Sequence, residues 1–191
     1  MRERAFRQRL LEQTEFAPRQ RVLDIGCGTG TFALMLAGGQ PDATVVGLDA
    51  DARILALARD KAARAGVAVE WVQGSAIDLP FPTDSFDRVT SSLMLHHLTT
   101  PEKRAALASI RRVLRPGGSL HVADFGRPHT AYTRMAAALF RYFDGAERTA
   151  ANLDGQLPVL MREAGFAEVR ETEQWTTAFG TLTFTRAGAG A

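Results

Sequence analysis

The chain has 191 residues, of which 46% are hydrophobic and 23% are charged, and this composition is typical of one globular domain with an apolar core. Its net charge is only +2, its single cysteine is Cys27, and no apolar run approaches the length that crosses a bilayer. We therefore expect a cytoplasmic protein without disulfides, without stable membrane insertion and without a nucleic-acid partner.

The N-terminal part of the chain alternates helical and extended patterns. It begins with an amphipathic helix in which Phe6, Leu10 and Leu11 recur at helical spacing. Short apolar runs and amphipathic segments then follow each other, separated by Gly and Pro. The predicted elements are helix Arg2–Thr14, strand Arg21–Ile25, helix Thr31–Ala37, strand Thr44–Leu48, helix Ala52–Arg64 and strand Val67–Val72.

The alternation continues in the second half and then changes at the C-terminus. The predicted elements are strand Phe86–Ser91, helix Glu102–Leu114, strand Ser119–Phe125, helices Tyr132–Phe143 and Leu157–Ala164, and strands Glu168–Trp175 and Thr177–Thr185. The last two strands are too close in sequence for a helical crossover, so they predict an antiparallel hairpin. Residues Ala187–Ala191 have the composition of a disordered tail.

These elements predict an α/β fold: a Rossmann-like, doubly wound sheet of seven strands, mostly parallel, with a C-terminal antiparallel hairpin. Residues 1–191 are expected to form a single domain. Within it, residues 1–20 would form an N-terminal helical flap, and residues 126–156 would form a helical insert beyond the fifth strand.

The strongest motif is VLDIGCGTG at residues 22–30, where the first strand turns into the first crossover helix. Its glycines let backbone amides approach a ligand at the carboxyl edge of the sheet. A dinucleotide fingerprint would place its third glycine where this chain has Thr31. Moreover, Asp24 would repel a pyrophosphate but attract an amino group. The motif therefore favours a ligand without phosphate, although a Gly-rich turn alone could be only a tight loop.

Asp49 lies at the end of the second strand, at the distance from the glycine turn expected for a carboxylate that accepts both ribose hydroxyls. Taken alone, it could instead cap the next helix. Together, the glycine turn and Asp49 favour a nucleoside ligand.

Four sequence blocks resemble class I S-adenosylmethionine-dependent methyltransferases, of the small kind similar to ubiquinone/menaquinone methyltransferases. The blocks are VLDIGCGTG (22–30), GLDAD (47–51), GSAIDLPFPTDSFDRVTSSLMLHHL (74–98) and LRPGGSLHVADF (114–125). The resemblance implies that S-adenosyl-L-methionine is the cofactor and S-adenosyl-L-homocysteine the product. It says little about the methyl acceptor.

The resemblance also implies roles for individual residues. The methionine end would be held by Asp24, Gly26, Cys27, Gly28 and Gly30, with Ser91 and Ser92 on its other side. Asp49 would bind ribose, and the adenine would contact Ala50, Ser75 and Ala76. Ser75 departs from the pattern because an acidic residue is usual there, so its side-chain contact is less secure than the backbone contact of Ala76. Cys27 is expected to pack rather than to react.

Candidate catalytic residues are His96 and His97, which follow the fourth strand near the expected position of the methyl group. A histidine there could remove a proton from the acceptor, or it could only pack and support the loop. His129 and Tyr132 are candidates for the acceptor pocket, whereas His121 within the fifth strand is expected to be structural.

Several motifs of other methyltransferase classes are absent from the sequence. There is no Asn-Pro-Pro-Tyr-type motif, no second cysteine, and no obvious metal-binding carboxylate set. These features favour metal-free, in-line methyl transfer to a small-molecule acceptor, with residues 126–156 on the acceptor side. Two alternatives stay open: a catalytically silent protein that binds the cofactor for regulation, and an NAD-linked oxidoreductase.

Overall fold

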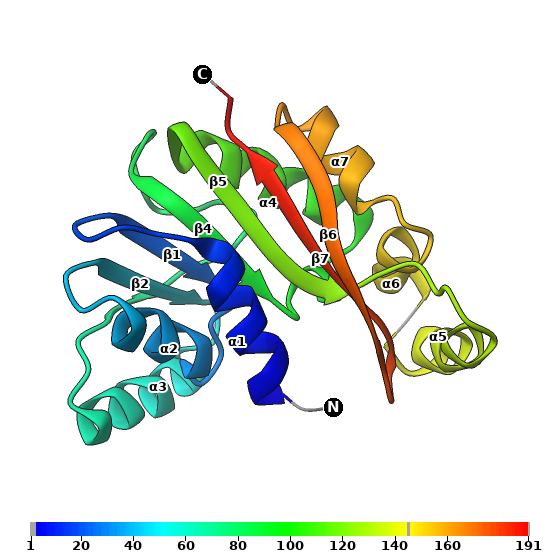
Figure 1. Cartoon of the computed structure of the whole chain (residues 1–191), viewed down its shortest axis with the longest axis horizontal. Helices are drawn as coiled ribbons and strands as arrows, with labels where there is room; N and C mark the ends of the chain where they lie inside the picture. The colour runs from blue at the N-terminus through cyan, green and yellow to red at the C-terminus, as the bar shows by residue number, and fades with distance from the viewer. Residues whose placement is uncertain (1–2, 145, 191) are drawn as a thin grey trace.

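The computed structural model describes residues 3–144 and 146–190, which form a seven-stranded sheet with helices on both faces (Figure 1). The strands lie in the order β3-β2-β1-β4-β5-β7-β6. The pairs among β1 to β5 are parallel, and β7 runs antiparallel to both of its neighbours. The predicted fold class is therefore confirmed, including the C-terminal antiparallel hairpin.

The strands are β1 (Arg21–Ile25), β2 (Thr44–Asp49), β3 (Glu70–Gln73), β4 (Phe86–Ser92), β5 (Leu114–Phe125), β6 (Ala167–Thr177) and β7 (Gly180–Gly188). The helices are α1 (Glu3–Thr14), α2 (Thr31–Gly39), α3 (Ala52–Ala65), the 3₁₀ turn η1 (Leu95–His97), α4 (Thr100–Val113), α5 (Ala131–Asp144), α6 (Ala146–Leu153) and α7 (Leu157–Glu163).

The sheet separates two apolar cores. Successive side chains of a strand point to opposite faces, so Val22 and Leu23 of β1 enter different cores. Val22 packs in a cluster with Phe6 of α1 and Phe32 of α2, whereas Leu23 belongs to a cluster that includes Ile110 of α4. This alternation places α1 and α2 on one face of the sheet and α4 on the other (Figure 1).

Local signals at the helix ends fix the crossovers. Helix α3 begins at the N-cap Asp51, whose carboxylate accepts a hydrogen bond from the Arg53 amide at 2.8 Å, and ends at Gly66 in the left-handed conformation. Helix α4 begins with a capping box between Thr99 and Glu102. These stops let short loops return the chain to the sheet, so that the carboxyl ends of the parallel strands meet at one edge.

The predicted disordered tail is wrong for its described part. Ala187 is fully buried and lies opposite Leu120 of β5, and the Gly117 amide donates to the Gly190 carbonyl at 2.8 Å. These small residues look disordered by composition, but they complete a ladder with β5, which also starts earlier than predicted, at Leu114. Ala191 lies outside the described residues.

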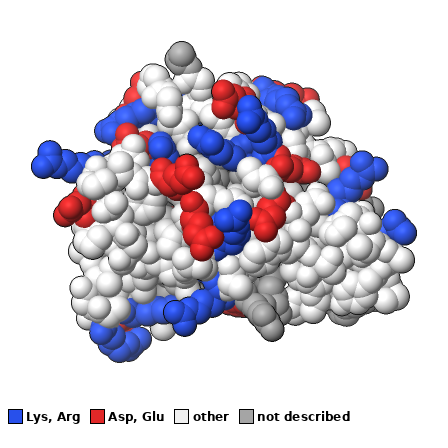
Figure 2. Space-filling model, viewed as in Figure 1, with Lys and Arg blue, Asp and Glu red and all other residues white. Residues whose placement is uncertain are grey.

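Other boundaries differ more modestly. The predicted strand Val67–Val72 is found at Glu70–Gln73, and α6 was not predicted as a separate helix. Across the described residues, no helix has both the length and the apolarity needed to span a membrane. Figure 2 shows that Lys and Arg side chains are interspersed with Asp and Glu on the face that carries α1.

Candidate functional site

The candidate site lies at the carboxyl ends of β1, β2 and β4, where the strand order reverses next to β1. Open α/β sheets bind ligands at such a switch point. Two adjoining pockets of about 410 Å³ and about 210 Å³ share Gly26, Gly28 and Leu93 in their walls. The larger pocket is lined by Gly26, Gly28, Leu48, Asp49, Ala50, Gly74, Ser75, Ala76, Leu93, Met94, His97 and Leu98. The smaller is lined by Arg7, Asp24, Gly26, Cys27, Gly28, Thr29, Thr31, Phe32, Ser92 and Leu93.

Gly28 forms the shared edge of the two pockets. Its φ is +55°, and a Cβ built on it would meet no atom within 4 Å. Since Gly28 lines both pockets, a side chain at this position would take up open space of the pockets. A Cβ on Gly26 would instead lie 2.3 Å from Cγ of Met94. These two glycines let the loop lie against Met94 while the pockets beside it stay open.

Gly30 has a different role from the one that the resemblance implies. It lines neither pocket. A Cβ at this position would lie 2.4 Å from the Trp71 ring and 3.1 Å from Ala58. Gly30 is therefore required for packing of the turn against β3 and α3, with a φ of +74° at the start of α2.

Asp24 is the buried carboxyl group of the smaller pocket. Its side chain is 1% exposed, Oδ1 accepts a hydrogen bond from Thr90 at 3.0 Å, and no described group completes a hydrogen bond to Oδ2. Burial raises the pKa of Asp24 to about 7, against the opposing effects of the Thr90 hydroxyl and the positive charge of Arg7. A buried carboxylate oxygen without a partner is costly, and a ligand ammonium would satisfy it.

Asp49 joins the glycine loop to the larger pocket. Its Oδ2 accepts from the Gly28 amide at 2.9 Å, and its Oδ1 accepts from the Asp51 amide at 3.0 Å. The N-cap of α3 is Asp51 rather than Asp49, so the alternative role of Asp49 as a helix cap is wrong. A carboxylate has about four lone-pair sites, so both oxygens retain capacity for ribose hydroxyls.

The residues predicted to contact adenine all belong to the wall of the larger pocket. Ala50, Ser75 and Ala76 all line it. The Ser75 side chain is exposed, and its hydroxyl accepts a long 3.4 Å hydrogen bond from the Ile77 amide. The same pocket is also lined by Leu93, Met94 and Leu98, which sequence reasoning did not assign.

Cys27 and the two serines after β4 differ in what they contribute. Burial raises the pKa of the Cys27 thiol, the opposite of what a nucleophile needs, so its packing role is favoured. Ser92 lines the smaller pocket. Ser91 is fully buried, and its hydroxyl has no hydrogen-bond partner among the described residues. Like Asp24 Oδ2, Ser91 Oγ is therefore a buried polar atom without a described hydrogen-bond partner at this edge of the sheet.

The two candidate histidines occupy different environments. His97 is exposed and lines the larger pocket, whereas His96 is 5% exposed and lies behind it, with the two ring centroids 3.9 Å apart. Nδ1 of His96 lies 2.6 Å from Oδ1 of Asp124, and its backbone amide donates to Oδ2 at 3.2 Å. Asp124 lies in the sequence block LRPGGSLHVADF (114–125), but only the structure shows its contact with His96.

The structure does not bring His129 and Tyr132 to these two pockets. The His129 ring forms hydrogen bonds with the hydroxyls of Thr181 at 3.0 Å and Thr176 at 3.1 Å. It lines a separate, open hollow of about 640 Å³. The Tyr132 hydroxyl donates to the Ala178 carbonyl at 2.9 Å. Their acceptor roles stay predictions. His121 is structural in this sense: it is buried, bonds to Ser119 at 2.9 Å, and burial lowers its pKa to about 3.

The residues present fit S-adenosylmethionine. The smaller pocket has an unpartnered carboxylate for an ammonium, and the larger has a carboxylate beside space for a nucleoside. A cation, Arg7 of α1, also lines the smaller pocket. Sequence reasoning missed Arg7, although α1 was expected to act as a flap. Among the described residues, no cluster of three or more His, Cys, Asp or Glu could hold a metal ion.

Comparisons with known proteins identify the family of this chain. The family model "Methyltransferase domain" matches residues 22–118. An uncharacterized methyltransferase from Synechocystis is 36% identical over 169 residues, covering 88% of this chain and 77% of the relative. A demethylmenaquinone methyltransferase from Thermus thermophilus is 44% identical over 114 residues, covering 60% of this chain and 50% of the relative.

Solved structures share the fold. The crystal structure of a putative methyltransferase from Bacillus halodurans has a TM-score of 0.79 at 22% identity, covering 98% of this chain and 100% of that one. The YcgJ protein from Bacillus subtilis has a TM-score of 0.82 at 20% identity, covering 98% and 99% of the two chains. The chain belongs to the methyltransferase domain family and is a class I S-adenosylmethionine-dependent methyltransferase with a Rossmann-like fold.

Proposed function

We propose that this methyltransferase acts on a quinol-type ring of a small-molecule acceptor. Two relatives support this class by name: the Thermus protein and a 2-phytyl-1,4-naphtoquinone methyltransferase from Synechococcus elongatus, which is 35% identical over 123 residues. The chain spans about half the length of each, 50% and 51%. The observation that carries the proposal is the buried pair of His96 and Asp124 behind the larger pocket, because a quinol must lose a proton during methylation.

We also propose that residues 126–156 form the acceptor side of the site. Phe125, Ala137 of α5 and Leu153 of α6 form an apolar cluster, and Leu93 packs against it. Leu93 lines both cofactor pockets, so this cluster lies directly behind their shared wall. An aromatic acceptor held there would be adjacent to the junction between the amino-acid and nucleoside ends of the cofactor.

The cofactor, when bound, supplies an electrophilic methyl group on a good leaving group. The residues of this chain then have two tasks. Asp24 and Asp49 hold the two ends of the cofactor, while Leu93 and Met94 exclude water from the wall between them. Orienting two reactants in this way can contribute ~7–11 kcal/mol to lowering the barrier.

His96 is the proposed base. The 2.6 Å contact with Asp124 favours a proton on Nδ1, which makes Nε2 the basic nitrogen of the neutral ring. Nε2 would accept the proton of the acceptor hydroxyl as a carbon of the acceptor ring takes the methyl group and S-adenosylhomocysteine is left. The methylated carbon would then lose its hydrogen as a proton, the acceptor oxygen would regain one, and the aromatic ring would be restored. Asp124 acts through His96 by holding its tautomer and orientation, so it is a positioning residue.

A methylation screen tests the proposal. The purified chain is incubated with S-adenosylmethionine and a reduced naphthoquinone, and with thiol, amine, carboxylate and phospholipid acceptors, while S-adenosylhomocysteine is measured. Product formed with the naphthoquinol is the expected result. Turnover confined to another acceptor class refutes the quinol proposal. Tight binding of S-adenosylhomocysteine without turnover of any acceptor would favour a catalytically silent regulatory protein, and preferential binding of NADH would favour the oxidoreductase.

A further inference from the structure

The smaller pocket carries opposite charges on walls that come from distant parts of the chain. Asp24 lies on β1, and Arg7 lies on α1, which crosses the same face of the sheet as α2 (Figure 1). The amino-acid end of S-adenosylmethionine also carries opposite charges, an ammonium and a carboxylate. We propose that Arg7 binds this carboxylate while Asp24 binds the ammonium, so that α1 completes the cofactor site. This inference rests on S-adenosylmethionine being the cofactor.

Arg7 is positioned for such a contact. Its side chain is 19% exposed and donates through Nη1 to Glu3 at 2.9 Å, a bond that uses one of the five N–H donors of a guanidinium. The guanidinium also lies 5.0 Å from the ring centroid of Phe6, which is fully buried. The fork of a guanidinium matches a carboxylate with two parallel hydrogen bonds, so a partly desolvated arginine suits this ligand group.

No other cation competes for this role among the described residues that line the pocket. Lys61 of α3 contacts a residue of the wall, because its ammonium donates to the Thr31 hydroxyl at 2.6 Å. Lys61 holds a wall residue but is not itself part of the wall. The charge balance of the pocket is therefore one anion, Asp24, and one cation, Arg7, which is what an amino-acid zwitterion requires.

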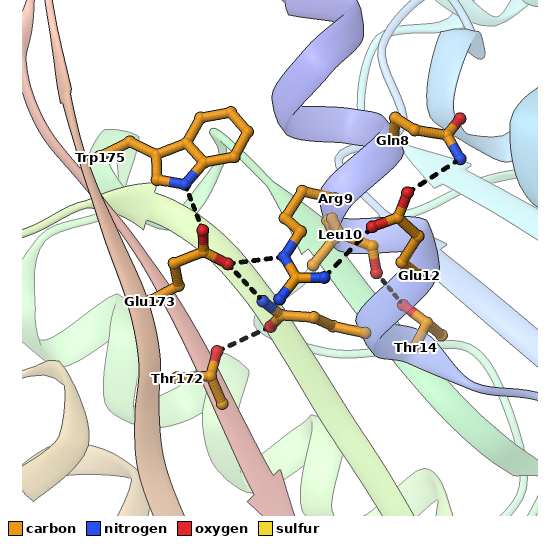
Figure 3. Close-up of polar contacts among 9 residues, drawn as sticks. Gln8, Arg9, Leu10, Glu12, Thr14, Thr172, Glu173 and Trp175 are labelled. Atoms are coloured by element: carbon orange, nitrogen blue, oxygen red, sulfur yellow. Dashed lines mark hydrogen bonds and ion pairs between the residues drawn. The ribbon is translucent and has the colours of Figure 1, made fainter.

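A polar network holds α1 in the orientation that this role needs (Figure 3). Glu173 of β6 accepts hydrogen bonds from Arg9 at 2.6 Å, from Gln13 at 3.2 Å and from Trp175 at 2.6 Å. Thr172 donates to Gln13 at 2.7 Å, which adds a second link between β6 and the helix. The last turns of α1 are thereby tied to the C-terminal hairpin.

Helical periodicity explains how one short helix makes all these contacts. Phe6 and Leu10, four residues apart, share the face that enters the core. Arg7 is about 100° around the helix from Phe6 on one side, and Arg9 is about 60° from it on the other. Arg7 therefore faces the pocket while Arg9 faces β6. The network fixes the rotation of α1, and the rotation places Arg7.

Calorimetric titration of the full chain with three ligands tests the proposal. S-adenosylhomocysteine has both charged groups, its decarboxylated analogue keeps only the ammonium, and 5′-methylthioadenosine has neither. Arg7→Met is expected to weaken S-adenosylhomocysteine binding about 10- to 100-fold, the range for losing hydrogen bonds between charged groups. It is expected to leave the dissociation constants of the other two ligands within about twofold, and Arg7→Lys should lose less than Arg7→Met because it keeps the charge.

Arg4→Met is the matched control, because Arg4 is exposed on the same helix and lines neither pocket. It should change no ligand's affinity. Retained binding of 5′-methylthioadenosine shows that a variant's nucleoside site is folded. An equal loss for all three ligands in Arg7→Met, or no loss for S-adenosylhomocysteine, overturns the role of Arg7. If the unmodified chain binds neither S-adenosylhomocysteine nor 5′-methylthioadenosine, the cofactor assignment itself fails and this inference fails with it.

Discussion

Replacing Asp24 by Asn removes the anion that the cofactor ammonium requires while nearly preserving the volume of the side chain. Asp24 is fully buried, and its Oδ2 has no described hydrogen-bond partner. At pH 7.5 the variant should bind S-adenosylhomocysteine ~10- to 100-fold more weakly, since a hydrogen bond between charged groups is lost. The affinity for 5′-methylthioadenosine should change little, because that ligand has no ammonium.

The pH dependence gives a sharper form of this prediction. With the pKa of Asp24 raised to about 7, mainly by burial, the ionised fraction falls as the solution is acidified. If only the ionised form binds the ammonium, S-adenosylhomocysteine affinity should fall about eightfold between pH 7.5 and pH 6. The ligand keeps its ammonium proton as the pH falls, so the change belongs to the protein. Asp24→Asn should abolish it.

Titration calorimetry at several pH values measures both effects on the same samples. Binding of 5′-methylthioadenosine at each pH controls for a general change in the protein. A flat profile for the unmodified chain, or an unchanged pH dependence in Asp24→Asn, would refute the assignment of the ammonium to Asp24. An equal loss of affinity for 5′-methylthioadenosine would show that the variant had disturbed the whole site.

The same pKa also predicts how the ligand-free protein responds to pH. A carboxyl whose pKa rises on folding, here from 3.8 to about 7, binds its proton more tightly in the folded state. Its contribution to stability is complete below about pH 4 and is lost as the pH rises through about 7. The shift corresponds to a change in the free energy of unfolding on the order of 4 kcal/mol. Chemical denaturation of Asp24→Asn between pH 5 and pH 8 should lack this component, and an identical pH profile would contradict it.

The remaining predictions concern the other parts of the site. Asp49→Ala should weaken S-adenosylmethionine binding by ~1.5–3 kcal/mol for each ribose hydrogen bond lost, and an unchanged calorimetric dissociation constant in a folded variant would remove Asp49 from the site. Gly28→Val should abolish S-adenosylmethionine binding because the valine side chain would occupy both pockets, and retained affinity for this ligand would contradict the prediction. His96→Gln should lower turnover ~10²–10⁴-fold with cofactor affinity nearly intact, and a normal rate in this variant would exclude His96 as the general base. Glu173→Gln should weaken S-adenosylhomocysteine binding a few-fold through α1, with 5′-methylthioadenosine as the insensitive control.

The sequence was sufficient for the parts of the site that depend on local chemistry. The glycine turn and the carboxylates at 24 and 49 follow strand ends, and parallel strands in a doubly wound sheet bring such ends together. This is why Asp24, Gly28 and Asp49 could be placed in one site before their contacts were known. The helix stops and the alternating strands are equally local, since they follow from backbone sterics and side-chain periodicity.

Some local patterns misled because a distant residue decides the outcome. Gly30 belongs to the glycine motif, yet Trp71 of β3 occupies the space beside it. The local pattern around His129 did not reveal that its ring hydrogen-bonds to Thr176 and Thr181 of the hairpin, and its role toward the acceptor stays a prediction. Ala187 lies in a stretch with the composition of a tail, but pairing with β5 buries it.

The residues that only the tertiary structure revealed are those defined by a partner far away in the chain. Arg7 reaches the pocket of Asp24 because α1 packs on the sheet and is tied to Glu173. Asp124 has a proposed positioning role because its carboxylate lies 2.6 Å from His96. The sequence determined the fold class, the cofactor and the two candidate side chains for binding it, Asp24 and Asp49, because strand order and ligand chemistry follow from local patterns. It did not determine these pairings, because a contact between distant segments has no periodicity or spacing from which it could be predicted.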